Sequence, residues 1–276
     1  MIRPLATLVL AGSRPGRADP LLDGTGLSSK ALLPISGKPM LAHVLASLNE
    51  APQVGPITVV AQDTALLAAH PQIIANAARV TWRDGAGSIA DAVRTAIEEA
   101  DGPVFVTTAD NVLLTPPIIA QFLRDAAGGD VAVGLVERRT VDAAGHSTRR
   151  TWLKFRGGQW SGANLFYLGG VQALPLVEFW RGLEQERKKG MKIVGALGPG
   201  VLIAALLRLV DVHQFAARVG KRFGLTGRVV AMSAAEACID ADKPSDIPVI
   251  EAILAERQVS ANAASTAASA SVSSSS

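Results

Sequence analysis

The chain has 276 residues, of which 49% are apolar and only 4% are aromatic, and its formal net charge is +3 at pH 7. This apolar fraction is enough for a substantial core. So small a basic excess, without interleaved aromatic residues, does not indicate a nucleic-acid-binding protein. The single cysteine, Cys238, excludes a disulfide framework within a monomer, and we expect it to be buried. No segment reads as a secretory signal or an uninterrupted membrane span, so we expect a cytoplasmic protein.

Strands alternate with helices through the first half of the sequence. Apolar runs predict strands, and apolar residues at helical spacing predict helices, with Ser88 as an N-cap and a Pro-Pro pair at another helix start. In chain order we expect a strand over 6–10, a helix over 39–48, a strand over 56–61, a short helix over 65–69, strands over 79–82 and 104–108 on either side of a helix over 88–100, a helix over 116–127 and a strand over 130–137. This alternation predicts an α/β fold with a mostly parallel sheet and helices on both faces.

The second half is less regular. We expect strands over 151–155, 163–168 and 229–232, helices over 171–189 and 244–257, and an apolar segment over 193–210 that Gly and Pro interrupt. Residues 258–276 are nearly all Ala and Ser without periodicity, which predicts a disordered tail. The sequence therefore predicts one domain over 1–257, with a helical insertion at 187–227.

A small-residue loop follows the first strand and carries two arginines, and a lysine follows further along the chain. Glycine has no Cβ, so the backbone N–H groups of such a loop can approach an anion, and arginine and lysine supply the countercharge. The loop matches neither the dinucleotide-binding pattern nor the P-loop pattern. Its residues predict a triphosphate site: Ala11, Gly12, Ser13, Arg14, Arg17 and Lys30.

The string Leu-Ala-Gly-Ser-Arg-Pro-Gly-Arg at 10–17, followed by Lys-Ala-Leu-Leu-Pro-Ile-Ser-Gly-Lys-Pro-Met at 30–40, resembles the signature of the NTP-transferase family. That family includes molybdenum-cofactor guanylyltransferase and the sugar-1-phosphate uridylyl- and cytidylyltransferases. Ser13 replaces the usual second Gly but keeps a backbone N–H that we expect to be available, and Ser29 replaces a Pro. The positions that match are Gly12, Arg17, Lys30, Gly37 and Pro39.

The resemblance covers residues 5–170 and 228–257 and implies a Rossmann-like nucleotide-diphospho-sugar transferase fold. It implies a Mg²⁺-dependent nucleotidyltransferase, which moves a nucleoside monophosphate from an NTP to a phosphorylated small-molecule acceptor and releases pyrophosphate. Arg17 and Lys30 would then neutralise the triphosphate and the leaving pyrophosphate, while residues 11–14 would contact the nucleotide. The aspartate at position 242 slightly favours CTP as the NTP. GTP and UTP stay open as alternatives.

Two aspartates stand where a metal ligand is expected. Asp110 follows the strand over 104–108, and ligands of open parallel sheets bind outside the carboxyl ends of strands. A carboxylate there suits Mg²⁺, which takes one or two carboxylates together with substrate phosphates. The resemblance assigns the first metal ligand to Asp110 and the second to Asp242. The alternatives are a turn or capping role, and for Asp242 both roles are compatible.

Two further segments carry the other predicted contacts. Gly87 and Ser88 open a helix in a region that touches the nucleotide in the family, and an ordinary turn with an N-cap is the alternative. Asn164 belongs to a strand that lines the acceptor pocket in the family. Lys154, which alternates with other basic residues from Arg150 to Arg156, would grip the acceptor phosphate. A solvated edge strand is the alternative for that run.

A basic run at 187–192 precedes the apolar segment that ends at 210. This arrangement is typical of core packing or of a homodimer contact, and it also fits contact with a membrane surface. Gly-Pro-Gly at 198–200 and Arg208 argue against a spanning helix. Two other functions therefore stay open: a nucleotide-binding module without turnover, and a membrane-surface enzyme that acts on a lipid-headgroup phosphate.

Overall fold

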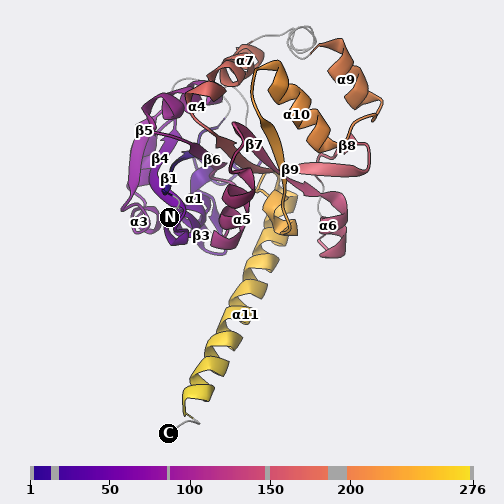
Figure 1. The fold of residues 1–276 in the computed structure, drawn as a ribbon. Helices are drawn as coiled ribbons and strands as arrows, with labels where there is room; N and C mark the ends of the chain where they lie inside the picture. The colour runs from indigo at the N-terminus through magenta and orange to yellow at the C-terminus, as the bar shows by residue number, and fades with distance from the viewer. Residues whose placement is uncertain (1–2, 14–18, 86–87, 147–149, 186–197, 274–276) are drawn as a thin grey trace.

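The computed structural model describes residues 3–13, 19–85, 88–146, 150–185 and 198–273 (Figure 1). Three residues predicted to contact the nucleotide, Arg14, Arg17 and Gly87, lie outside this part of the chain. The same holds for residues 186–197, which carry the end of one predicted helix and the start of the apolar segment.

One mixed sheet organises the molecule, with strand order β10-β7-β9-β6-β1-β4-β5 and β8 paired to β9. Strand β9 runs antiparallel to β6 and β7, and the other neighbours on the main path are parallel. The strands are β1 (Leu5–Leu10), β4 (Val54–Ala61), β5 (Val80–Asp84), β6 (Val104–Thr108), β7 (Val131–Glu137), β8 (Leu153–Phe155), β9 (Gly158–Leu168) and β10 (Gly227–Ala231), with a separate small pair, β2 (Pro34–Ile35) and β3 (Lys38–Pro39). The mostly parallel sheet predicted from the sequence is confirmed.

Helices cover both faces of this sheet. Neighbouring residues of β1 point to opposite faces: Val9 joins a core with α1 and α5, and Leu8 joins a core with α4 and α7. The helices are α1 (Met40–Glu50), α2 (Thr64–Ala68), α3 (Pro71–Ile74), α4 (Ile89–Glu99), α5 (Pro116–Ala126), α6 (Arg138–Ala143), α7 (Leu174–Gln185), α9 (Pro199–Leu206), α10 (Val212–Arg222) and α11 (Ile247–Ser273), with 3-10 turns η1 (Lys30–Leu32), η2 (Val171–Ala173), η3 (Ala235–Cys238) and η4 (Pro244–Asp246).

The predicted insertion contains α9 and α10 where the structure describes it, and α10 packs along the edge strand β10 (Figure 1). Cys238 is buried, as predicted, and burial raises the pKa of its thiol to about 11. Among the described residues, no helix is long and apolar enough to cross a membrane.

Helix α11 differs from the prediction for the end of the chain. The sequence predicts disorder from residue 258, but the structure continues the helix to Ser273, and Figure 1 shows it projecting from the body. The tail's composition explains the difference, because Ala has the highest intrinsic helix propensity and the helix before it supplies a nucleus. The absence of apolar periodicity shows only that this extension has no face to bury.

Candidate functional site

The predicted phosphate loop and Asp110, a predicted metal ligand, follow neighbouring strands at the same edge of the sheet. The backbone N–H of Ala11 donates to the carbonyl of Val60 over 2.8 Å, and that of Ala109 donates to the carbonyl of Leu10 over 3.0 Å. Ala11 and Ala109 directly follow β1 and β6, and their acceptors lie in the last two residues of the parallel neighbours β4 and β1. The carboxyl edge of this part of the sheet is therefore the candidate site.

Lys30 and Asp110 meet at this edge. Lys30 Nζ lies 2.9 Å from Asp110 Oδ2, and the two side chains are only 16% and 22% exposed. Thr108 Oγ1 donates a hydrogen bond to the other carboxylate oxygen. Lys30 lies in η1, 80 residues from Asp110 along the chain, so this pair depends on the tertiary fold.

The backbone of the residue before Asp242 contacts the backbone of Asp110. The N–H of Ala241 donates to the carbonyl of Asp110 over 3.0 Å, so Asp242 is the next residue after that contact. The buried carboxylate of Asp246 accepts hydrogen bonds from the N–H groups of Asp242 and Lys243, at 3.2 and 2.8 Å. Asp246 therefore does the capping, and the exposed side chain of Asp242 accepts no hydrogen bond from the described residues.

These residues suit a hard divalent cation. Within the described part of the chain, no group of three or more His, Cys, Asp or Glu side chains is placed to hold a metal ion, and Asp110 and Asp242 stay the predicted ligands. Mg²⁺ commonly takes one or two carboxylates and completes its shell with water and substrate phosphates. The ammonium of Lys30 against Asp110 shows that this carboxylate already pairs with positive charge. Two carboxylates have the donor chemistry that Mg²⁺ takes, and their joint coordination of the ion stays a prediction.

Gln62 holds the start of the phosphate loop, a role that the sequence analysis missed. Its side-chain amide accepts from Ser13 N–H over 2.9 Å and donates to the Ser13 carbonyl over 2.5 Å. The expectation that the Ser13 N–H is available is therefore wrong in this structure, because Gln62 occupies it. Gln62 directly follows β4, the strand beside β1, and that position was the one signal for it.

The turn after β5 is fixed at both ends of its described part. Gly85 N–H donates to the Ala61 carbonyl over 2.7 Å, and a Cβ on Gly85 would lie 2.6 Å from Val60 Cγ1. Ser88 caps α4 in a capping box with Asp91: its N–H and hydroxyl both donate to the Asp91 carboxylate, and its hydroxyl accepts from the Asp91 N–H. Ser88 is thus the N-cap of α4, which is the alternative role that the sequence analysis gives for it.

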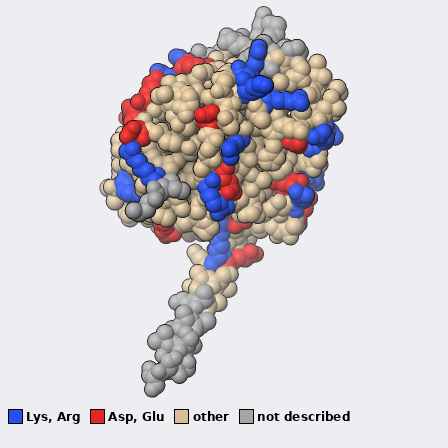
Figure 2. Space-filling view, in the orientation of Figure 1, with Lys and Arg blue, Asp and Glu red and all other residues tan. Residues whose placement is uncertain are grey.

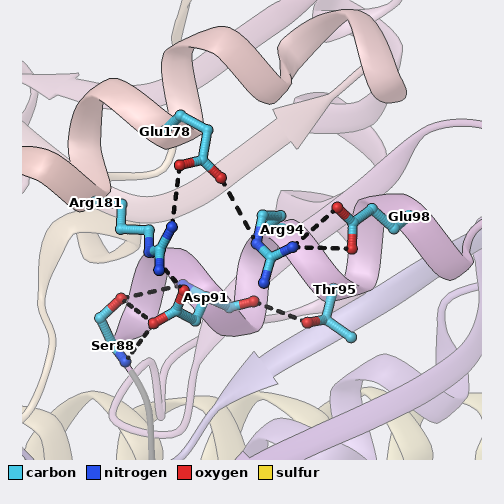
Figure 3. A network of polar contacts seen from close by, with 7 residues as sticks. All are labelled: Ser88, Asp91, Arg94, Thr95, Glu98, Glu178 and Arg181. Atoms are coloured by element: carbon cyan, nitrogen blue, oxygen red, sulfur yellow. Dashed lines mark hydrogen bonds and ion pairs between the residues drawn. The ribbon is translucent and has the colours of Figure 1, made fainter.

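Helix α7 is tied to this cap by alternating charges (Figure 3). Arg181 Nε lies 2.8 Å from Asp91 Oδ1, and Glu178 bridges Arg181 and Arg94 at 3.3 and 3.6 Å. The hydrogen bond from the Ser88 backbone, with smaller contributions from the Ser88 hydroxyl, Arg181 and Arg94, lowers the pKa of the Asp91 carboxyl. An ion pair with α7 therefore reaches the turn that precedes α4.

The predicted acceptor residues lie apart on β8 and β9. Asn164 takes a left-handed backbone conformation, with φ of 52°, and its amide donates to Asp240 Oδ2 over 2.8 Å. Arg150 forms an ion pair with the other oxygen of Asp240. Since β8 begins only at Leu153, Arg150 is not on that strand, and the predicted alternation of basic residues on one face is wrong. Lys154 is exposed on β8, opposite Gln159.

Asn111 is a second residue that the sequence analysis missed. It is buried, and its amide donates to the Ala163 carbonyl over 3.1 Å. This bond ties the turn that carries Asp110 to β9, next to Asn164. Its position directly after a predicted metal ligand was the available signal in the sequence.

The sequence matches one protein family. The family described as MobA-like NTP transferase domain matches residues 7–182. Among curated proteins, the bifunctional protein GlmU of Parvibaculum lavamentivorans is 25% identical over 249 residues, which cover 85% of this chain and 51% of GlmU. The chain thus spans about half the length of this relative.

Several solved structures share the fold of this chain. A hypothetical transferase from Thermus thermophilus has a TM-score of 0.72 and 25% identity, covering 89% of this chain and 99% of that chain. CMP:2-keto-3-deoxy-manno-octonic acid synthetase, solved with CTP, has a TM-score of 0.57 and 16% identity, covering 92% and 99%. The 4-diphosphocytidyl-2C-methyl-D-erythritol synthase from Anaerococcus prevotii has a TM-score of 0.57 and 8% identity, covering 91% and 96%. The predicted nucleotide-diphospho-sugar transferase fold is confirmed.

Proposed function

Because the chain belongs to the family of MobA-like NTP transferase domains, we propose that it transfers a nucleoside monophosphate from an NTP to a phosphorylated small-molecule acceptor, in the cytoplasm. The observation that carries this proposal is the ion pair of Lys30 with Asp110 at the carboxyl edge of the sheet, where the N–H of Ala241, the residue before Asp242, donates to the Asp110 carbonyl. Three segments far apart in the sequence supply these residues, so the arrangement is a property of the fold.

The proposed reaction needs positioning and charge rather than a general base. An oxygen of the acceptor phosphate attacks the α-phosphorus of the NTP, a new P–O bond forms, and the bond to the leaving pyrophosphate breaks. The acceptor is already anionic, so no proton has to be removed from it. Lys30 would neutralise charge on the triphosphate and the leaving group, and preorganised charge of this kind is a large catalytic contribution.

Asp110 and Asp242 would hold Mg²⁺, which neutralises phosphate oxygens and orients the two substrates when it is bound. The support for this assignment is the family signature and the oxygen chemistry of the two carboxylates. Lys30 pairs with Asp110 in the structure. We therefore propose that Lys30 exchanges this carboxylate for a phosphate group when the nucleotide binds.

The nucleotide would lie along residues 11–13 and the turn before α4. Gly12 is exposed and has no Cβ, which leaves its backbone accessible. The Ser13 N–H would contribute only after release from Gln62, and Ser88 would act by shaping the turn that contains Gly87. Arg14 and Arg17 remain predicted triphosphate contacts, and Lys154 and Asn164 remain predicted acceptor contacts.

CTP is the NTP that we propose first. Asp242 supports CTP on the sequence argument, and two structural neighbours are a CMP-transferring synthetase and a diphosphocytidyl synthase by their titles. At 16% and 8% identity these neighbours bear on the fold, so GTP and UTP stay in the test. The experiment is a panel of four NTPs against sugar, polyol and pterin phosphates, with pyrophosphate release as the readout.

A nucleotide-binding module without turnover is the competing function. Such a module would use Lys30 to bind the triphosphate but would not need Asp110 and Asp242 to hold a metal ion. The panel distinguishes the two functions when NTP binding is measured alongside by calorimetry. Binding without pyrophosphate release for any acceptor would favour the module.

A lipid-headgroup phosphate is a second candidate acceptor, because Leu206 and Leu207 are exposed at the end of α9. Phosphorylated headgroup analogues and lipid vesicles added to the same panel test this acceptor. Pyrophosphate release that requires the intact lipid would favour it over a free phosphate.

A further inference from the structure

Four large aliphatic side chains are exposed within one short segment at the end of α9. Ile203, Leu206, Leu207 and Leu209 are 52%, 81%, 61% and 58% exposed. A contiguous group of this kind is different from the scattered exposed aliphatic residues of an ordinary surface, and it marks an interaction site.

The fold holds these side chains outward. Leu209 N–H donates to the Ala204 carbonyl over 2.8 Å, and Arg208 between them takes a left-handed conformation with φ of 54°. Ala204 and Val210 are buried, and the Val210 carbonyl accepts from Arg156 N–H over 3.0 Å. The segment is therefore anchored on both sides, and the exposed leucines belong to an ordered turn.

Basic residues are frequent in this part of the sequence. Residues 187–235 contain nine Lys or Arg and a single acidic residue, Asp211, so the rest of the chain has five more acidic than basic residues. Arg208, Arg218 and Lys221 are exposed, and among the described residues their side chains form no ion pair. Figure 2 shows Lys and Arg side chains gathered over α10.

We propose that the face formed by α9 and α10 docks on an anionic lipid surface. Exposed aliphatic side chains bordered by cationic ones match the boundary between acyl chains and anionic headgroups. A second copy of the chain would bring the same excess of positive charge against itself across a two-fold interface. Since no described helix could span a membrane, the contact would lie on the surface. This inference goes beyond nucleotidyl transfer and does not rest on it.

The test is co-sedimentation of the full chain with vesicles of phosphatidylcholine alone and of phosphatidylcholine mixed with phosphatidylglycerol. We expect binding to the mixed vesicles that weakens at high salt, because screening reduces the attraction between exposed charges. The double variant L206Q/L207Q should bind about tenfold more weakly or worse, since it loses two leucine side chains that the proposed contact would bury in the acyl layer. The double variant R218Q/K221Q should lose much of the preference for the anionic vesicles.

The matched control is I74Q/V171Q, which changes two aliphatic residues that are 59% and 63% exposed elsewhere on the molecule. It should bind like the wild type, and circular dichroism should show that all variants fold. Equal binding to both vesicle types, no binding at all, or equal losses in control and test variants would overturn the proposal. A dimer in light scattering that L206Q/L207Q dissociates, without vesicle binding, would also overturn it and assign the face to a second copy.

Discussion

Lys30 Nζ lies 2.9 Å from Asp110 Oδ2 in a pair that is mostly shielded from water. If Lys30 neutralises the triphosphate, then Lys30→Ala should raise the KM for the NTP and lower kcat, with a combined loss of about a hundredfold in kcat/KM. Steady-state pyrophosphate release measures both constants. Lys38→Ala is the control, because it removes another partly buried lysine outside the site. An unchanged kcat/KM for Lys30→Ala would remove the proposed role.

Gln62 offers a test of the phosphate loop itself. Gln62→Glu keeps the shape of the side chain but loses the donor that bonds the Ser13 carbonyl and adds a negative charge beside the loop. We expect the KM for the NTP to rise about fivefold or more, the value of one hydrogen bond of ~1 kcal/mol. Gln72→Glu provides the comparison, because Gln72 bonds the carbonyl of Gly37 in another turn. The same KM in both variants would contradict a loop-holding role for Gln62.

Arg181 is expected to position the turn before α4 through Asp91. Arg181→Met removes the partner of Asp91, while Arg94→Met breaks the other half of the α4–α7 contact and leaves Arg181 on Asp91. Both variants should lose similar stability, about 0.5–1 kcal/mol for a partly exposed network. Only Arg181→Met should raise the KM for the NTP, by severalfold, with kcat retained and with partial rescue by Arg181→Lys. Equal KM values for the NTP in the two variants would show that the network stabilises the fold and does not position the turn.

His43 should make stability depend on pH. Burial is the main cause that lowers its pKa below the ordinary 6.5. As the pH falls through 6.5, the unfolded chain takes up the proton first, so this contribution to stability is complete above 6.5 and is lost toward the lower folded-state pKa. Urea unfolding at several pH values should show this loss, and His43→Gln should flatten it. An unchanged pH profile in His43→Gln would contradict the assignment.

Most of the fold of the first half could be predicted from the sequence because β1, β4, β6 and β7 are bounded apolar runs, whereas the two-residue strands β2 and β3 were missed. The strand over 104–108 was predicted to the residue, as β6. The start of β9 was missed because Gly158, Gln159 and Trp160 show no alternation, and their pairing with β8 supplies the strand instead. The helical end of α11 was missed because local propensity, rather than burial, forms it.

For the candidate site, the sequence predicted the charged groups and missed the residues that hold them. Lys30, Asp110 and Asp242 could be predicted because strand ends and a family signature indicate them. The positions of Gln62 and Asn111, after a strand and after Asp110, were the only signals for them, and neither indicates the partner some fifty residues away through which each acts. The occupied N–H of Ser13 follows from the same contact with Gln62.

The most direct test of the proposed transfer is pyrophosphate release by Asp110→Ala. The Ala241 hydrogen bond uses the backbone carbonyl of Asp110, so the variant should fold and keep its melting temperature within a few degrees, as should the exposed control Asp101→Ala. With Mg²⁺ and the best NTP and acceptor of the panel, we predict turnover by the wild type and Asp101→Ala and none by Asp110→Ala. Near-wild-type release by a folded Asp110→Ala would contradict the account.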